Sequence, residues 1–371
     1  MRNLKEYIVE GIFDTDEDTI DKSIKDQIKQ FLKENFKGAS SCKISRKPNT
    51  DGKYEVSSSK NITVINKKLT SFTNKLFVWV KVGGKFDCSG CKSLTSLEGA
   101  PKEVSVFYCN ECSSLTSLEG APKEIGMDFQ CGDCNSLTSL EGAPEKVGRN
   151  FNCSRCTSLT SLEGVPKEVG GSFSCWECKS LKSLKGAPEE VGEGFYMSCC
   201  TLLTSLEGLP KKVGGDFKCW ECKSLTSLKG APKEVGGDFD CHNCASLTSL
   251  EGAPEKVGRN FNCRECNSLI SLEGAPKEVG GSFRCEICKS LTSLEGAPRE
   301  VGGDFKCWCC HSLTSLKGAP KEVGGDFDCD SCDSLTSLEG APKEVGGNFS
   351  CWNCRVKFTV DDVKKVSNVK G

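Results

Sequence analysis

The apolar positions between residues 86 and 354 recur with a fixed period. The pattern Phe-x-Cys-x-x-Cys occurs twelve times, and a thirteenth copy has Met197 in place of the first cysteine. Successive copies lie 22 residues apart, except for the first step, from Cys88 to Cys109, which is 21 residues. Such a period is typical of stacked repeats, in which one unit cannot bury its apolar side chains alone. We therefore expect one elongated array rather than separate globular domains.

Each repeat contains a strand signal followed by turn signals. Phe86 and Cys88 alternate with polar residues, which places both side chains on the inner face of a short strand. Two leucines, an alanine and a valine then recur every three or four residues, with glycine and proline between them. The sequence thus predicts a repeat solenoid, mainly β, with a ladder of parallel strands and a turn-rich far side.

Residues 1–60 do not repeat and predict a small α+β cap. Isoleucine, leucine and phenylalanine recur at helical spacing over residues 20–36, and Gly38 is a plausible stop. The segments 42–44 and 54–56 flank a Pro-Asn-Thr-Asp-Gly turn, which indicates a hairpin. Solenoids need such caps because an uncovered end repeat exposes apolar surface.

The array itself is expected to span residues 61–354. It begins with a degenerate turn over 62–72, and its 13 Cys-containing repeats follow. Residues 355–371 break the pattern and are expected to form a C-terminal cap, with a last strand over 358–360 and a short helix over 361–366.

Composition removes several function classes. The formal charge is −2, so no basic field points to nucleic acid, and no apolar run is long enough for a membrane span. The first residues lack the apolar core of a secretory signal. A chain with 28 cysteines and no export signal is expected to be cytoplasmic, in a bacterium or a phage-infected host, with reduced thiols. The chain contains only two histidines and no phosphate-binding loop motif, so we expect no enzyme activity.

The cysteines have a structural and a chemical interpretation. Free cysteine behaves as a small apolar residue, and Met197 fits a core position but is a poor replacement for a zinc-binding thiolate. We therefore expect buried columns of thiols and no cofactor. A metal-binding array and ladder disulfides remain alternatives. The candidate metal ligands are the two histidines and cysteines near them: Cys241, His242, Cys244, Cys307, Cys310 and His311.

Variation between the repeats is concentrated beside the phenylalanine and between the two cysteines. On a strand, the residue before Phe, the residue after it and the first residue between the cysteines share one face, which points away from the core. Four of the five tryptophans occupy the last of these columns. Exposed aromatic residues are common anchors of protein recognition. The predicted partner-binding residues are Trp176, Trp220, Trp308, Trp352, Tyr108, Tyr196, Lys218, Arg264, Arg284, Lys306, Asp326, Asp328 and Asp330.

The repeat resembles the leucine-rich-repeat family over about four-fifths of the chain. Phe-x-Cys-x-x-Cys lies over the L-x-L-x-x-N/C part of that signature. The apolar positions that follow resemble the tail of the short-repeat leucine-rich proteins secreted by enteric pathogens; they are Leu94, Leu97, Pro101 and Val104. The resemblance implies an inward second cysteine and a concave strand face that binds a partner. One extra residue before Leu94 and one after Val104 leave the curvature open.

Residues 1–10 resemble the capsid-targeting leaders of internal head proteins in large tailed phages. Such leaders are cut after a glutamate, which here would be Glu10, so that Gly11 would become the new N terminus. The SLEGAPKEVGG repeats are also similar to those of phage and gut-bacterial proteins. An ordinary first helical turn is the alternative for this segment.

These observations predict a non-enzymatic protein–protein interaction module with an unknown protein partner. A phage virion-associated or injected protein carrying this module is one alternative, and a Cys-rich metal-binding array is another. The block EKVGRNFNC occurs at 145–153 and again at 255–263, so recent duplication and surface drift could also account for the repeated tryptophans.

Overall fold

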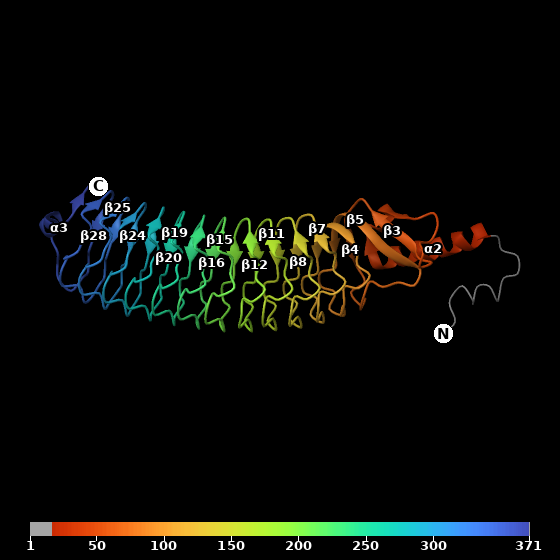
Figure 1. The fold of residues 1–371 in the computed structure, drawn as a ribbon, viewed down its shortest axis with the longest axis horizontal. Helices are drawn as coiled ribbons and strands as arrows, with labels where there is room; N and C mark the ends of the chain where they lie inside the picture. Colours follow the sequence, from red (N-terminus) through yellow and green to blue (C-terminus); the bar gives the residue numbers. More distant parts are fainter. Residues whose placement is uncertain (1–16, 371) are drawn as a thin grey trace.

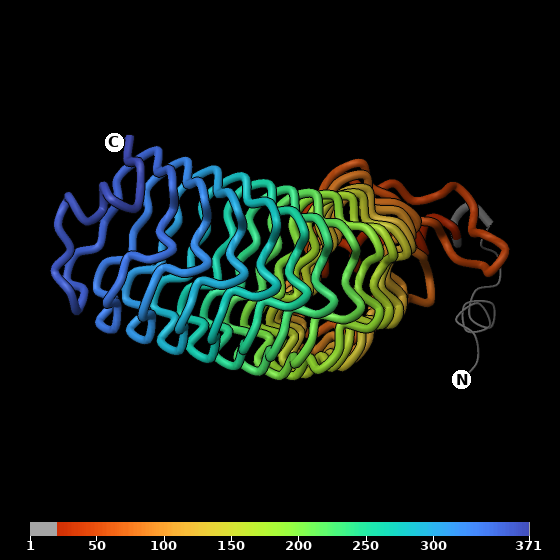
Figure 2. The backbone as a smooth tube through the Cα atoms, turned by 60° about the vertical axis from the view of Figure 1, so that its left-hand side comes forward, coloured from red at the N-terminus to blue at the C-terminus, as the bar shows by residue number. Residues whose placement is uncertain are grey.

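The chain forms a gently bent β-solenoid with stacked turns of about 22 residues (Figures 1 and 2). The computed structural model describes residues 17–370, so the expected leader at residues 1–10 lies outside the described residues. In Figure 1 the strands lie toward the upper, slightly concave edge, and the turns bow outward along the lower edge. None of the helices in residues 17–370 is long and apolar enough to cross a membrane.

Two parallel strand ladders run along the solenoid, and the predicted strand at each phenylalanine forms one of them. We call this the Phe ladder; Phe151, for example, lies between Phe129 and Phe173 in register. Its strands are β4 (Ile62–Val64), β5 (Phe77–Asp87), β6 (Glu103–Tyr108), β8 (Phe129–Gln130), β10 (Phe151–Asn152), β12 (Phe173–Ser174), β14 (Phe195–Tyr196), β16 (Phe217–Lys218), β18 (Phe239–Asp240), β20 (Phe261–Asn262), β22 (Phe283–Arg284), β24 (Phe305–Lys306), β26 (Phe327–Asp328) and β28 (Phe349–Ser350).

A second ladder, the Val ladder, was not expected from the sequence. It is built from the Glu-Val or Lys-Val pair that precedes the glycines of each turn, as in the register of Val169 with Val191. Its strands are β3 (Tyr54–Ser58), β5, β6, β7 (Glu124–Ile125), β9 (Lys146–Val147), β11 (Glu168–Val169), β13 (Glu190–Val191), β15 (Lys212–Val213), β17 (Glu234–Val235), β19 (Lys256–Val257), β21 (Glu278–Val279), β23 (Glu300–Val301), β25 (Glu322–Val323), β27 (Glu344–Val345) and β29 (Asn368–Val369).

The two ladders are joined in the first turns and separate later. The single 21-residue step leaves one residue fewer between Val104 and Phe107 than later turns have, so the backbone of β6 runs unbroken through both ladders. The long strand β5 does the same and absorbs its extra residue in a register shift between Val82 and Lys85. In later turns one more residue lies between the valine and the phenylalanine. The strand of the Val ladder therefore ends before the strand of the Phe ladder begins.

Two glycine positions allow the turns to stack closely. A Cβ on Gly170 would lie 2.2 Å from the carbonyl oxygen of Gly148 in the preceding turn. Gly120 has a φ of +89°, and a Cβ there would lie 2.4 Å from the backbone nitrogen of Glu98. Side chains at either position would push neighbouring turns apart, which explains why these glycines recur with the period of the repeat.

The core is a set of columns, one for each apolar position of the repeat. Neighbouring phenylalanines of the thirteen-ring stack have centroids 4.9–5.8 Å apart. Phe217 and its flanking Cys219 are both fully buried, as are the leucines of the same turn. Parallel stacking of identical turns therefore buries what a single turn would expose, as the period predicted.

The N-terminal end is closed by a helix, a hairpin and an aromatic cluster. The expected helix is α2 (Glu17–Asn35), and it stops before Phe36 because that residue begins β1 (Phe36–Lys37), which pairs antiparallel with β4. A short 3₁₀ turn, η1 (Ala39–Ser41), leads to β2 (Cys42–Ile44), which pairs with β3 as the expected hairpin. The ring of Phe36 meets that of Trp79 edge-on at 5.3 Å.

The C-terminal end differs from the expectation. The strand predicted over 358–360 does not form, because Thr359 caps a helix instead. That helix, α3 (Val360–Val366), begins with a capping box in which Thr359 Oγ1 accepts from the N–H of Asp362 at 3.2 Å and the Asp362 carboxylate accepts from the N–H of Thr359 at 3.0 Å. The last strand is β29, which pairs with β27 at the end of the Val ladder.

Candidate binding face

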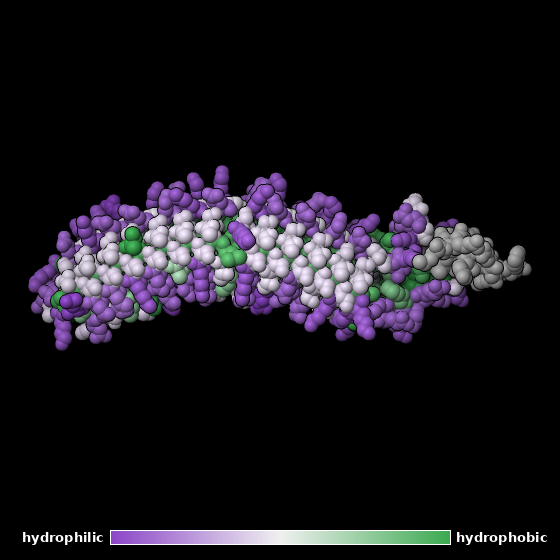
Figure 3. All heavy atoms as spheres, turned by 90° about the horizontal axis from the view of Figure 1, so that it is seen from below, coloured by the Kyte–Doolittle hydropathy of each residue, from purple (hydrophilic) through white to green (hydrophobic). Residues whose placement is uncertain are grey.

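The outward side chains of the Phe ladder form what we call the strand face. It comprises the residue before each phenylalanine, the residue after it and the first residue between the two cysteines. Most of these side chains are half-buried rather than fully exposed, because neighbouring turns bring equivalent side chains against one another. The opposite, turn side appears in Figure 3 as a band of intermediate hydropathy bordered by hydrophilic side chains.

The residues before the phenylalanines form a polar ladder over much of the array, interrupted at Val106 and Gly194. Asp238 Oδ1 accepts from the backbone N–H of Asn260 at 3.0 Å, and Asn260 Oδ1 accepts from that of Ser282 at 2.8 Å. Asp326 Oδ1 accepts in the same way from Asn348 at 2.7 Å. The prediction that this column is free surface is therefore wrong in part. One carboxylate oxygen of Asp326 accepts a hydrogen bond from the backbone of the next turn.

A residue with left-handed backbone conformation follows the tryptophan column in every repeat. Twelve such residues, including Arg155 and Glu177, have φ between +54° and +61°, and in the first repeat the position is Gly90 with a φ of +72°. A left-handed non-glycine residue costs on the order of 1 kcal/mol, so the stacked array stabilises a conformation that an isolated turn would avoid. This conformation turns the chain back so that the second cysteine points inward.

The tryptophan column is less exposed than expected. Trp176, Trp220 and Trp308 are half-buried, and Trp352 is 74% exposed. The guanidinium of Arg155 lies 4.7 Å from the ring centroid of Trp176. The rings of Trp220 and His242 stack at 5.4 Å. Trp176 and Trp220 are thus held in place by side chains of neighbouring turns.

Four members of the same column are buried, Gly132 among them, which contradicts the expectation that the whole column is exposed. Ser154, Ser198 and Glu286 are 8%, 2% and 0% exposed. Glu286 Oε1 accepts from Nε of Arg284 at 3.0 Å, whereas its Oε2 has no hydrogen-bond partner. Arg284 is therefore engaged inside the array as well as on its surface.

The cationic and tyrosine members of the predicted set pair with neighbouring side chains, most of which lie outside that set. Lys306 lies 3.1 Å from Asp304, and Lys218 lies 3.3 Å from Asp216 and 5.7 Å from the ring centroid of Tyr196. Two further pairs are Lys85 over Tyr108 at 5.1 Å and Arg264 with Glu265 at 2.6 Å. Cation and aromatic groups from adjacent columns are consequently held in fixed positions.

One part of the strand face carries more carboxylates than cations. Burial opposes ionisation of Asp304, but a hydrogen bond from the N–H of Asp326 and the ion pair with Lys306 outweigh it and lower its pKa. Burial raises the pKa of Asp328, and the charge of Asp330 adds to this effect. Asp328 and Asp330, two members of the predicted acidic cluster, are therefore close enough for their charges to repel.

The cysteines line the inside of the solenoid. The thiol of Cys244 lies 3.3 Å from the carbonyl oxygen of Cys219 in the preceding turn, and the same contact recurs along the array. Where Met197 replaces the first cysteine, Cys222 contacts its carbonyl oxygen at 3.5 Å. Because the acceptor is backbone, the methionine does not interrupt the series. All 28 cysteines are free thiols.

The candidate metal ligands do not converge on a point. His242 Nδ1 lies 2.8 Å from Asp240, and His311 Nδ1 lies 2.9 Å from Asp333. Burial raises the pKa of Cys310 to about 12 and that of Cys307 well above its usual value, which keeps both thiols protonated. Within residues 17–370, no group of three or more His, Cys, Asp or Glu side chains is arranged to hold a metal ion. The neighbouring cysteine candidates, Cys241 and Cys244, are fully buried.

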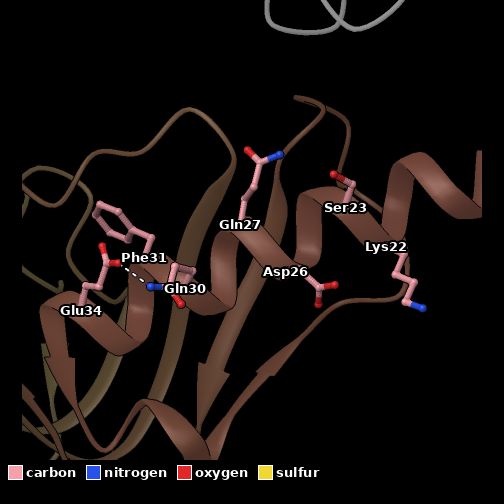
Figure 4. A pocket seen from close by; sticks show the side chains of 7 residues that line it. All are labelled: Lys22, Ser23, Asp26, Gln27, Gln30, Phe31 and Glu34. Carbon is pink, nitrogen blue, oxygen red and sulfur yellow. Dashed lines mark hydrogen bonds between the residues drawn. The ribbon is translucent and has the colours of Figure 1, made fainter. Parts of the chain in front are cut away.

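A hollow on the N-terminal helix offers no converging chemistry. All seven residues that line it belong to α2 (Figure 4). Gln30 donates to Glu34 one turn away, and Lys22 lies toward the other end of the hollow. A surface drawn from a single helix does not bring together an acid, a base and a nucleophile.

Comparison with known proteins gives one structural likeness. No protein-family model and no curated protein matches the chain. A solved structure, a leucine-rich repeat protein from Bacteroides ovatus ATCC 8483, is similar to it with 15% sequence identity and a TM-score of 0.45, covering 84% of this chain and 89% of that protein. A likeness of this size assigns no binding surface to the present chain.

Proposed function

We propose that this protein is a non-enzymatic protein–protein interaction module and that its partner binds the strand face. The observation that carries this proposal is that the strand face holds aromatic and charged side chains against one another between neighbouring turns. Trp220 stacked on His242 and Lys218 above Tyr196 are examples. Preorganised aromatic groups lose little entropy on binding, which favours their use as anchors.

The negative charge around Asp328 suggests which part of the face sets specificity. A partner surface with lysine or arginine opposite this cluster would gain attraction and faster association, whereas an acidic surface would be repelled. Because the thiols are free and inward, the proposal also places the protein in a reducing, cytoplasmic setting. The alternative, a phage-associated protein with a leader at residues 1–10, stays a prediction.

The proposal is tested by comparing two matched variants of the full chain. Trp220→Ser with Trp308→Ser alters the strand face, and Leu202→Ser with Ile270→Ser alters exposed apolar residues elsewhere in the array, of which Ile270 is 58% exposed. Immobilised wild-type chain should retain a partner from extract of its native cells. We expect the first variant to lose that partner and the second to keep it. Equal retention by both variants would rule out the strand face.

A further inference from the structure

The Phe ladder ends without a partner strand. In every earlier turn three backbone N–H groups donate to the following turn, and the last such set is donated by Phe327, Cys329 and Ser331 at 2.8, 2.9 and 2.7 Å. The equivalent N–H groups of the last turn belong to Phe349, Cys351 and Asn353. Among residues 17–370 they have no acceptor.

The neighbouring Val ladder continues for one more strand at the same end, β29, which pairs with β27 alone. The N–H of Asn368 donates to the carbonyl of Lys343 at 2.8 Å, and that of Lys370 donates to Val345 at 2.9 Å. The C-terminal cap therefore supplies a last strand for one ladder and leaves β28 as an open edge. Open strand edges are sites where a further strand can add.

The side chains around this edge are less buried than their equivalents. Phe349, Cys351 and Cys354 are half-buried, whereas the corresponding residues of the preceding turns are fully buried. Large apolar side chains also gather here: Trp352, Val356 and Val360 are 74%, 38% and 69% exposed. They are three of the seven exposed large hydrophobic residues found in the described part of the chain. Burial of these groups would provide the driving force for association.

The charges at this end suit an identical surface. Arg355, Lys357 and Asp361 are exposed, and none of them forms an ion pair within residues 17–370. A surface of one sign would repel a second copy of itself. A surface that carries both signs can face its own copy with opposite charges adjacent.

We propose that this end of the array is an interface with a second copy of the same chain, joined tail to tail through β28. Two-fold symmetry requires antiparallel pairing of identical edges, centred here on Ser350. Phe349 then lies opposite Cys351 of the second copy, and Cys351 lies opposite Phe349 of the second copy. In each of these two pairs the N–H of either residue donates to the carbonyl of the other. Both side chains point inward, so the Phe column of each solenoid meets the first-cysteine column of the other. The two-fold pairing uses the β28 edge of both copies, so this contact joins two chains and no third.

Analytical ultracentrifugation of the full chain over a wide range of concentration tests this interface. We expect a concentration-dependent species of twice the 40.1 kDa of one chain. Small-angle scattering should show a nearly doubled maximum dimension, which separates a tail-to-tail dimer from a side-by-side one. A chain that stays monomeric at every concentration would overturn the proposal, as would a dimer whose length is that of one chain.

Matched variants locate the contact. Val360→Lys changes an exposed residue of this end, and Ile270→Lys changes another exposed apolar residue elsewhere in the array. We expect the first to abolish the dimer and the second to leave it intact, with unchanged circular dichroism in both. Hydrogen exchange at Phe349 and Cys351 should be slower in the wild-type dimer than in the Val360→Lys monomer. Equal exchange rates would contradict pairing through β28. Neither variant changes Trp220 or Trp308, so this test is independent of the partner-binding proposal.

Discussion

The two sides of one strand behave differently throughout the array. On the inner side, the phenylalanine recurs in every repeat and is fully buried in all turns except the last. The next residue along the chain points to the outer side, and it changes from Lys218 to Asp240 to Asn262 in successive turns. The comparison shows that stacking fixes the inner positions, whereas the outer positions are free to acquire or lose a binding role.

Alkaline pH should produce the largest loss of stability, because it acts on many buried thiols of the inner wall at once. The hydrogen bond with Cys200 lowers the pKa of Cys175, but burial and the charges of neighbouring thiols outweigh it and keep that pKa at about 12 in the folded chain. Burial raises the pKa of Cys310 to about 12 as well, against a usual value of 9.0. Between these values the unfolded chain releases protons that the folded chain retains, so stability is intact below pH 9 and falls as the pH rises toward 12. Thermal midpoints measured from pH 7 to 11 check this. A midpoint that rises above pH 9 would contradict a buried wall of protonated thiols.

Removal of one ring from the inner wall should have the largest effect of any single substitution. Phe217→Ala leaves a cavity between two stacked rings and should lower the free energy of unfolding by about 3–5 kcal/mol. Lys218→Ala, on the outer side of the same strand, is the matched control and should cost less than about 1 kcal/mol. Urea unfolding of both variants measures the difference. Similar losses would mean that the two sides do not differ in stability.

A cysteine substitution should separate packing from thiol chemistry. Cys244→Ala removes a buried sulfur and its contact with the carbonyl of Cys219, and we expect a loss of about 1–3 kcal/mol. Cys244→Ser retains a donor for that carbonyl and should lose less. The same urea titration applies. If serine were as damaging as alanine, the contact with the carbonyl would be unimportant.

The polar ladder should give a smaller effect. Asp238 accepts from both the backbone and the side chain of Asn260, so Asp238→Ala should cost about 1 kcal/mol, and Asp238→Asn should recover most of it because one acceptor oxygen remains. Chemical unfolding of the two variants is the check. A loss of equal size in both would show that negative charge, rather than an acceptor oxygen, is what this position provides.

The exposed end of the tryptophan column should give the smallest effect. Trp352 is 74% exposed, so Trp352→Ser should change the unfolding free energy of the isolated chain by less than about 0.5 kcal/mol. Thermal unfolding at low concentration measures it. A large loss would mean that Trp352 packs against the array and is not an available anchor.

The inner side could be predicted from the sequence because period and alternation together define it. Phe86, Cys88 and the leucines recur with the period of the repeat. In stacked turns these apolar side chains can be buried only on the inner side. The Val ladder was missed because a Glu-Val pair between proline and glycine is too short for alternation to be read. The shorter segment between Val104 and Phe107 was the available signal, since it contains no turn residue.

The strand face could be located from the sequence but not described. The alternation rule correctly placed Trp220 and Asp328 on one side, and it carries no information on contacts between neighbouring turns. Those contacts decide that Trp220 stacks on His242 and that Glu286 is buried beside Arg284. The recurrence of Asp, Asn or Ser before phenylalanine was a signal for the polar ladder, since these side chains bond to backbone amides.

The inner position of the cysteines is the central feature of this solenoid, and timed alkylation of the native chain tests that position directly. Cys42, Cys309, Cys351 and Cys354 are the only cysteines that are not buried, and they should react first at neutral pH. The others should react only on unfolding, when all 28 become modified without a reductant or a chelator. Rapid reaction of the buried columns in the native state, or protection that persists after unfolding until metal or disulfides are removed, would contradict the account.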